Sequence, residues 1–192
     1  MKRRLLPVLV IMLVTGCSSS TAGGTTVVPG TEAPAGATSA TPKPVVMGPG
    51  EYTFENATGT VGAISIPGTP DPEIEKLRAF VGSEPVDYLT VKVDNRKGTV
   101  GVSMFGVSIL TPDGQELNYE NASDYLDDIR PTGTPAELFN AFTKLGDQHR
   151  EPAKPLMVKD FVLVGPAVPA GISSVKVYPT DAVNPVDALP AN

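Results

Sequence analysis

Residues 86–114 read VDYLTVKVDNRKGTVGVSMFGVSILTPDG, and this stretch decides the fold class. Apolar residues alternate with polar ones from Val86 to Asp94, which is the pattern of a strand with one buried face. Asn95–Gly98 then supplies turn residues, including a glycine that can adopt positive φ. A second apolar run starts at Thr99. Residues 86–110 therefore predict a β-hairpin.

The second run changes phase along its length. Its apolar residues occupy even positions up to Met104 and odd positions from Phe105 onward. One extra residue in a strand turns every following side chain to the opposite face. We therefore predict a β-bulge within residues 103–106, where Gly106 relaxes the backbone. The residues Thr111–Gly114, with sequence TPDG, predict the turn that ends this strand.

Further short apolar segments, most of them bounded by glycine and proline, predict additional strands. They are Tyr52–Asn56, Val61–Ile66, Met157–Val164 and Ile172–Tyr178. Several short strands separated by such turn residues favour an antiparallel arrangement of two packed sheets. The fold class expected is mainly β, an antiparallel immunoglobulin-like β-sandwich with two short helices inserted between strands.

The two helices are predicted from their capping residues and apolar stripes. The first has Asp71 as its cap, Pro72 in its first turn and Gly82 at its end. The second follows the sequence TPAE at residues 134–137, which fits a capping box, and should stop at Gly146. Residues 121–130 fit either a helical turn or an edge strand.

The strand pattern resembles a known family. Val91–Asn95 (VKVDN), followed by a long strand and the turn at Thr111–Gly114, is similar to the immunoglobulin-like domain of small secreted and lipid-anchored proteins of Gram-positive cell envelopes. The similarity covers mainly residues 86–114, with support from the strands near Phe161 and residues 175–177. Many such domains have no known function. The resemblance implies a binding or accessory module without a catalytic centre.

The N-terminus predicts export. A basic start at residues 2–4 precedes the apolar run Leu5–Val14, which is too short for a membrane-spanning helix of about 20 residues. The sequence VTGC at residues 14–17 resembles the lipobox of bacterial lipoproteins. That resemblance implies cleavage before Cys17 and a diacylglycerol on its thiol. The alternative is an ordinary signal peptide cut nearby, with an incidental cysteine.

The remaining chain divides into a spacer, a body and a tail. Residues 18–47 are mostly Ser, Thr, Ala, Gly and Pro, without an aromatic residue, so we expect disorder over roughly 30 Å. The domains expected are therefore 1–16 signal peptide, 17–47 lipidated cysteine and spacer, 48–180 immunoglobulin-like sandwich and 181–192 loose tail. The localisation expected is the outer face of the cell membrane. Removing residues 1–16 takes away three of the 15 basic residues and changes the formal charge from −6 to −9.

The composition excludes several kinds of chemistry. One cysteine rules out an intramolecular disulfide and multi-cysteine zinc sites, and the acidic balance argues against a nucleic-acid partner. The only histidine, His149, is expected in an exposed loop, and no nucleophile motif accompanies it. Phosphate-binding glycine motifs and the calcium-loop pattern are missing. We therefore expect no catalytic residues, no metal and no cofactor.

The candidate binding surface is an acidic and aromatic stretch, since exposed aromatic residues beside charges can anchor an interface. Its residues are Tyr119, Asp124, Tyr125, Asp127 and Asp128. Three functions stay open. The first is a non-catalytic, lipid-anchored module that binds an envelope protein or another ligand. The second is a carrier of a lipid or other small apolar molecule. The third is a hydrolase of wall polysaccharide that uses an acidic pair.

Overall fold

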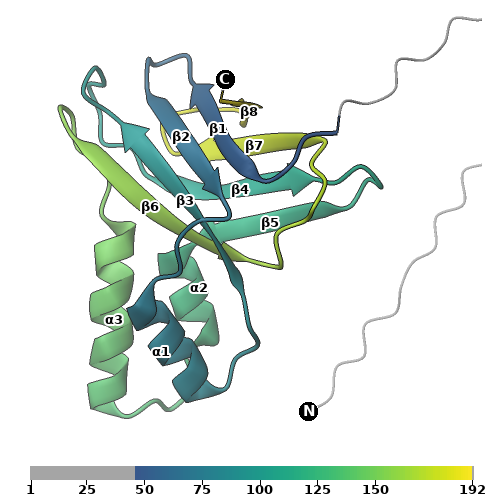
Figure 1. Cartoon of the computed structure of the whole chain (residues 1–192). Coiled ribbons are helices and arrows are strands. Elements are labelled where there is room, and N and C mark those ends of the chain that lie inside the picture. The colour runs from purple at the N-terminus through teal and green to yellow at the C-terminus, as the bar shows by residue number, and fades with distance from the viewer. Residues whose placement is uncertain (1–45, 192) are drawn as a thin grey trace, which may run out of the picture. The chain divides into compact units, whose positions relative to one another are not determined.

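The structure is a computed structural model and describes residues 46–191. It contains eight strands: β1 Gly50–Glu55, β2 Val61–Ile66, β3 Asp87–Asp94, β4 Met104–Leu110, β5 Glu116–Asn121, β6 Val158–Gly165, β7 Ser174–Pro179 and β8 Val186–Pro190. It also contains three helices: α1 Pro72–Val81, α2 Ala122–Ile129 and α3 Ala136–Arg150. Figure 1 shows the strands at one end of this part of the chain and the helices together at the other.

The sheet is a closed antiparallel barrel, so the predicted immunoglobulin-like β-sandwich is wrong. The strand order around the barrel is β1-β2-β3-β6-β5-β4-β7-β8, and β8 pairs with β1 to close it. The predicted hairpin over residues 86–110 is also wrong, because β3 pairs with β2 and β6 whereas β4 pairs with β5 and β7. Alternation identifies which face of a strand is buried, but the same alternation suits a sandwich or a barrel.

Inward-facing side chains fill the barrel. Leu89, Val91 and Val93 of β3 point inside, as the alternation predicts, and join a single core with residues from the other strands. The largest members are aromatic: Tyr52, Phe54, Tyr119 and Phe161. Close packing of this kind is the main source of stability in a small domain.

Two local predictions on either side of β4 are confirmed. The pairing of β4 with β7 shifts register between Met104 and Gly106, which places a bulge where the phase of the sequence changes. At this position the backbone of Tyr119 approaches closely, since an added Cβ on Gly106 would lie 2.5 Å from the Tyr119 carbonyl oxygen. Thr111–Gly114 forms the turn between β4 and β5, with Gly114 at φ 88°.

The helix α1 begins and ends as predicted. The Asp71 carboxylate accepts hydrogen bonds from the backbone N–H groups of Glu73 and Ile74, and Gly82 ends the helix in the left-handed conformation. A side-chain network then fixes α1 against the barrel: the Tyr88 hydroxyl donates to Glu75 at 2.7 Å, and Arg78 donates to the same carboxylate.

There are three helices in the described residues, not two, because residues 122–129 form α2. Its cap is Asn121, whose side chain accepts from the Ser123 N–H and donates to the Met104 carbonyl. The helix α3 also differs from its prediction. Thr134 does not cap it and instead donates to the Pro131 carbonyl, and the helix continues through the buried Gly146 to Arg150.

Both ends of the predicted body extend further than expected. Residues 186–190, expected in the loose tail 181–192, form β8 between β1 and β7. Asp181 accepts hydrogen bonds from Asn56, Thr58 and Thr60, which fixes the segment before β8 to the β1–β2 turn. At the other end, Met47 pairs with Ile172 although it falls within the predicted spacer.

Candidate functional site

The aromatic half of the predicted binding surface is buried. Tyr119 is 1% exposed inside the barrel, and Tyr125 lies in the cluster between the helices and the barrel wall. Burial raises the pKa of Tyr119 to about 12 and also raises the pKa of Tyr125. Neither hydroxyl has a hydrogen-bond partner within the described residues. These side chains stabilise the core and cannot anchor an interface.

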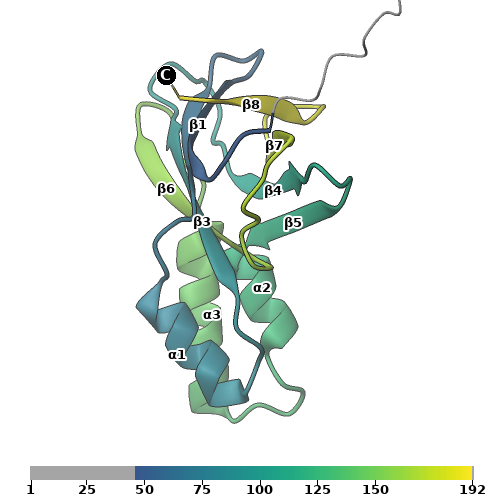
Figure 2. The ribbon, with the colours of Figure 1, turned by 45° about the vertical axis from the view of Figure 1, so that its right-hand side comes forward.

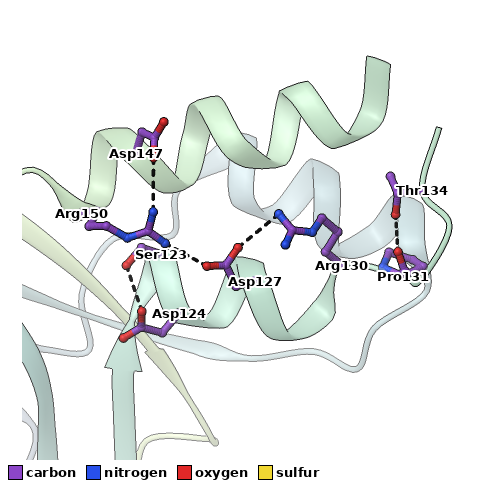
Figure 3. Close-up of polar contacts among 8 residues, drawn as sticks. All are labelled: Ser123, Asp124, Asp127, Arg130, Pro131, Thr134, Asp147 and Arg150. Carbon is purple, nitrogen blue, oxygen red and sulfur yellow. Dashed lines mark hydrogen bonds and ion pairs between the residues drawn. The ribbon is translucent and has the colours of Figure 1, made fainter. Parts of the chain in front are cut away.

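The acidic half of that surface lies exposed on α2 but does not converge on one point. Figure 3 shows Asp127 directed toward α3, where it pairs with Arg150 at 2.8 Å and with Arg130 at 3.2 Å. Asp124 points away from α3 and accepts a hydrogen bond from Ser123. Asp128 is exposed as well. The arrangement therefore ties α2 to α3 and does not present two facing carboxylates of the kind that glycoside hydrolysis requires.

Glu120 at the end of β5 adds a further carboxylate near α2. Partial burial raises the pKa of Glu120, and the negative charges of Asp128 and Asp124 raise it further. In residues 46–191, however, no group of three or more histidine, cysteine, aspartate and glutamate side chains could hold a metal ion. The predicted lipidation site, Cys17, lies outside the described residues.

In the described part of the chain, α1 and α3 line a groove with a volume of about 590 Å³. Its apolar lining comes from Leu77 and Phe80 on α1 and from Leu138, Ala141 and Leu145 on α3. Its polar lining consists of Glu73, Lys76, Glu137, Lys144 and Gln148. We call this feature the α1–α3 groove. Its volume lies within the range of roughly 300–1,000 Å³ that is typical of ligand sites.

The two walls of the groove run antiparallel. His149, near the end of α3, lies 3.5 Å from the carboxylate of Asp71, which caps the start of α1. Lys76 is five residues after Asp71, and Lys144 is five residues before His149. Because both helices rise by about 1.5 Å per residue, the two lysines lie at the same level on opposite walls. An apolar ligand with a negative group at that level would meet two ammonium groups, of which that of Lys76 lies 3.8 Å from the Glu73 carboxylate.

The contact between His149 and Asp71 sets the spacing of the walls at one end. His149 is expected in an exposed loop, but it belongs to α3 and its side chain is only 12% exposed. Burial lowers the pKa of His149, the Asp71 carboxylate raises it, and the nearby ammonium group of Lys159 lowers it. Lys159 in turn donates to the Gln148 and Glu151 carbonyls at the end of α3.

The apolar stripe of α1 does not lie wholly against the barrel. Phe80 completes an apolar stripe with Ile74 and Leu77, but it is 72% exposed while the other two are buried. The signal that was missed is an excess of apolar residues: α1 is short, and its stripe is wider than the contact it makes with the barrel. Phe139 on α3 is similarly exposed, and Arg130 stacks on its ring.

Comparison with known proteins yields no relative, since no family model, curated protein or solved structure matches the chain. Within residues 46–191, the helices are all too short or too polar to span a bilayer. The function therefore has to be inferred from the residues of the chain itself.

Proposed function

We propose that this chain is a lipid-anchored lipoprotein of the bacterial envelope and acts as a non-catalytic binding module. Residues 2–17 support the anchor, because a basic start, a short apolar run and the lipobox-like VTGC precede the single cysteine. Two or more acyl chains hold a protein on a membrane durably. The protein would then be held on the outer face of the cell membrane through Cys17.

The observation that carries the binding function is the α1–α3 groove. Phe80 is 72% exposed and Ala141 is exposed, Leu138 and Leu145 are half-buried, and Leu77 is buried. Exposed apolar side chains that gather along a groove mark interaction sites. Its occupant would be an amphipathic helix of an envelope protein, since α1 and α3 present an open channel about 15 Å long for such a helix. Acidic side chains of that helix would pair with Lys76 and Lys144.

Site-specific photocrosslinking of the full-length chain in its own cells tests this function. A photoreactive residue at Phe80 lies in the groove, and one at the exposed Phe105 on β4 lies outside it. We expect a protein to be captured from position 80 and not from position 105. Capture of the same species from both positions, or of no protein from either, would contradict the proposal.

A charge-reversal variant then tests the role assigned to the lysines. Lys76→Glu combined with Lys144→Glu should weaken binding of the captured protein by about tenfold or more, because like charges would face each other. Lys176→Glu on β7 is the control, since Lys176 is exposed and β7 is distant in the strand order from β3 and β6, against which the helices pack. Equal affinity of both variants would mean that the partner does not bind through acidic side chains.

A second candidate function is a carrier of a lipid or other small apolar molecule, which the volume of the groove favours. The filled barrel interior does not favour it. Native mass spectrometry of the protein purified from its own envelope distinguishes the two functions. A co-purifying mass that is lost on Phe80→Asp substitution would support the carrier, and an unliganded mass together with crosslinked protein would support the binding module.

The anchor has a separate test. The N-terminal peptide of the mature protein should carry acyl groups on Cys17, measured by its mass or by incorporation of labelled palmitate, and Cys17→Ser should abolish both signals. An unmodified Cys17 beside a labelled control lipoprotein would overturn the lipid anchor, while leaving the groove experiments unaffected.

A further inference from the structure

Besides the α1–α3 groove, the fold leaves one further surface unexplained. It is a pair of loops at the end of the barrel away from the helices. These loops are residues 95–100 after β3 and residues 152–157 before β6, which lie next to one another (Figures 1 and 2). We call them together the loop tip. Apart from Ala153, which joins the barrel core, they belong neither to the barrel interior nor to the α1–α3 groove.

A buried asparagine holds the loop tip rigid. Asn95 is fully buried, and its side-chain amide donates to the Val100 carbonyl at 2.8 Å and to the Ala153 carbonyl at 2.7 Å. Its backbone N–H donates to the Met157 carbonyl, and its own carbonyl accepts from the Leu156 N–H. The two loops therefore move as one unit with the barrel.

The loop tip presents apolar side chains to solvent. Leu156 is 79% exposed, and Val100 and Met157 are about half exposed. Val61 and Val158 continue this apolar area along the barrel wall, where they flank Asp94 in one row across β2, β3 and β6. Apolar side chains held rigidly in water contribute little to folding, so this area is suited to contact with another apolar phase.

The backbone of Leu156 strengthens this inference. Leu156 has φ 67°, which makes it the only residue other than glycine with positive φ in the described part of the chain. Glycine or asparagine adopts this conformation with less steric conflict than leucine. A leucine that is both strained and exposed stabilises neither the loop nor the core. The residue is explained if its side chain has a contact outside the protein.

The charges around the loop tip indicate what that contact is. The two loops contain Arg96, Lys97 and Lys154 and no acidic residue, although acidic residues outnumber basic ones in the whole chain by 21 to 15. Arg96 pairs with Asp94 and Lys154 with Glu151, and both carboxylates lie just outside the loops. Apolar side chains surrounded by basic ones are typical of segments that bind the surface of an anionic bilayer.

We propose that the loop tip inserts its apolar side chains, Leu156 first, into the interfacial region of an anionic bilayer. This contact goes beyond the proposed function, because it is a second membrane attachment that involves the folded body. An acidic body held only by a tether would be repelled by an anionic surface. The loop tip would overcome this repulsion locally and would direct the helical end, with its groove, away from the membrane.

Tryptophan fluorescence measures this insertion directly, because the chain contains no tryptophan. Leu156→Trp in the full-length chain, reconstituted in vesicles through its own anchor, places a single reporter at the loop tip. Phe80→Trp is the matched control, since Phe80 is similarly exposed on α1 at the opposite end of the described body. Met157→Trp replaces the first variant if that variant does not fold.

We expect lipids brominated in their acyl chains to quench the reporter at position 156 in vesicles with phosphatidylglycerol, but not the reporter at position 80. Quenching should fall in purely zwitterionic vesicles and in high salt, because the screening length shortens from about 10 Å at 0.1 M to about 3 Å at 1 M. Lys97→Glu combined with Lys154→Glu should reduce it as well. The mass of the N-terminal peptide, measured on the same sample, reports the state of the anchor independently.

Three results would overturn the proposal. They are the absence of quenching at positions 156 and 157, equal quenching at position 80, and quenching that does not depend on anionic lipid. The first would also be the result if the loop tip binds a protein instead of a bilayer.

Discussion

The barrel interior and the α1–α3 groove use similar residues in opposite ways. In the barrel, aromatic and aliphatic side chains from every strand meet in one filled core. At the helical end, a smaller core lies between the helices and the outer face of β3 and β6, and Phe80 and Phe139 remain exposed beyond it. The apolar side chains inside the barrel are all covered by one another. The helices, in contrast, have more apolar surface than the barrel wall can bury.

The difference indicates a division of roles. The closed sheet supplies the free energy of unfolding, because burial of apolar area is the dominant stabilising term. The helix α1 is fixed to this sheet through the network of Glu75, Arg78 and Tyr88, and α3 is tied to α2 by the ion pair of Arg150 with Asp127. Their outer faces are therefore free to be selected for binding and not for stability.

Removal of a large side chain should separate the two regions most clearly. Phe161→Ala in the barrel core should lower the free energy of unfolding by about 3–5 kcal/mol, because it leaves a cavity among fully buried neighbours. Phe80→Ala in the groove should change it by no more than about 0.5 kcal/mol. Urea unfolding of both variants measures the difference. A similar loss from both would mean that the groove residues belong to the folding core.

Removal of one buried polar side chain tests whether the rigidity of the loop tip depends on it. Asn95→Ala removes both amide hydrogen bonds, and it leaves the Val100 carbonyl without this donor while the Ala153 carbonyl keeps its hydrogen bond from the Val102 N–H. The loss should cost about 1–3 kcal/mol. Asn118→Ala, at an exposed position on β5, is the control. Faster amide exchange confined to residues 95–102 and 153–157 should accompany the loss. Uniform acceleration around the barrel would contradict a local role.

Removal of the residue before each helix should lower the free energy of unfolding by different amounts for α1 and α3. Asp71→Ala removes the acceptor for two N–H groups at the start of α1 and should cost about 1 kcal/mol. Thr134→Ala should cost less than about 0.5 kcal/mol, because Thr134 does not cap α3. Thermal unfolding of the two variants checks this order. The reverse order would mean that the capping box expected from the sequence forms in solution.

The smallest effect should appear in the pH dependence of stability. Hydrogen bonds from Arg78 lower the pKa of Glu75 in the folded protein, against the opposing effect of burial. A lowered folded-state pKa stabilises the protein above the ordinary pKa of the carboxyl, and this stabilisation is lost as the pH falls through the lowered value.

Glu75→Gln should therefore lose less stability than the wild type between neutral pH and about pH 3. Glu73→Gln on the same helix is the control, since it also removes one carboxylate from α1. Parallel curves for both variants would show that the contacts of Glu75 with Arg78 and with Tyr88 of β3 do not contribute to stability in this pH range.

The sequence predicts local structure in this protein better than it predicts the arrangement of the parts. The phase change around Met104 and Gly106 predicts the bulge, and Asp71 with Gly82 predicts the ends of α1, because these signals act over a few residues. Closure of the barrel depends on pairings such as Thr53 with Leu189, and single-strand alternation carries no information about such partners. The same limit explains why Val86–Leu110 is not a hairpin.

The candidate site was misplaced for a related reason. Tyr119 and Tyr125 lie near several carboxylates in the sequence, but the alternation in β5 and the helical turn of α2 direct both rings inward while the carboxylates stay outside. The aromatic rings are thus buried, while the carboxylates next to them in the sequence face solvent. The groove joins residues 73–80 with 137–148, and nothing in either segment alone indicates that the other lies opposite.

The position of β8 has a consequence for how the molecule can be assembled. β8 is the final strand of the sheet, and it fills the space between β1 and β7. Until residues 186–190 are in place, β1 and β7 each present an open edge with unpaired backbone groups, and such edges recruit other chains. Truncation before residue 186 would therefore produce self-association through strand addition, even though it removes little of the core.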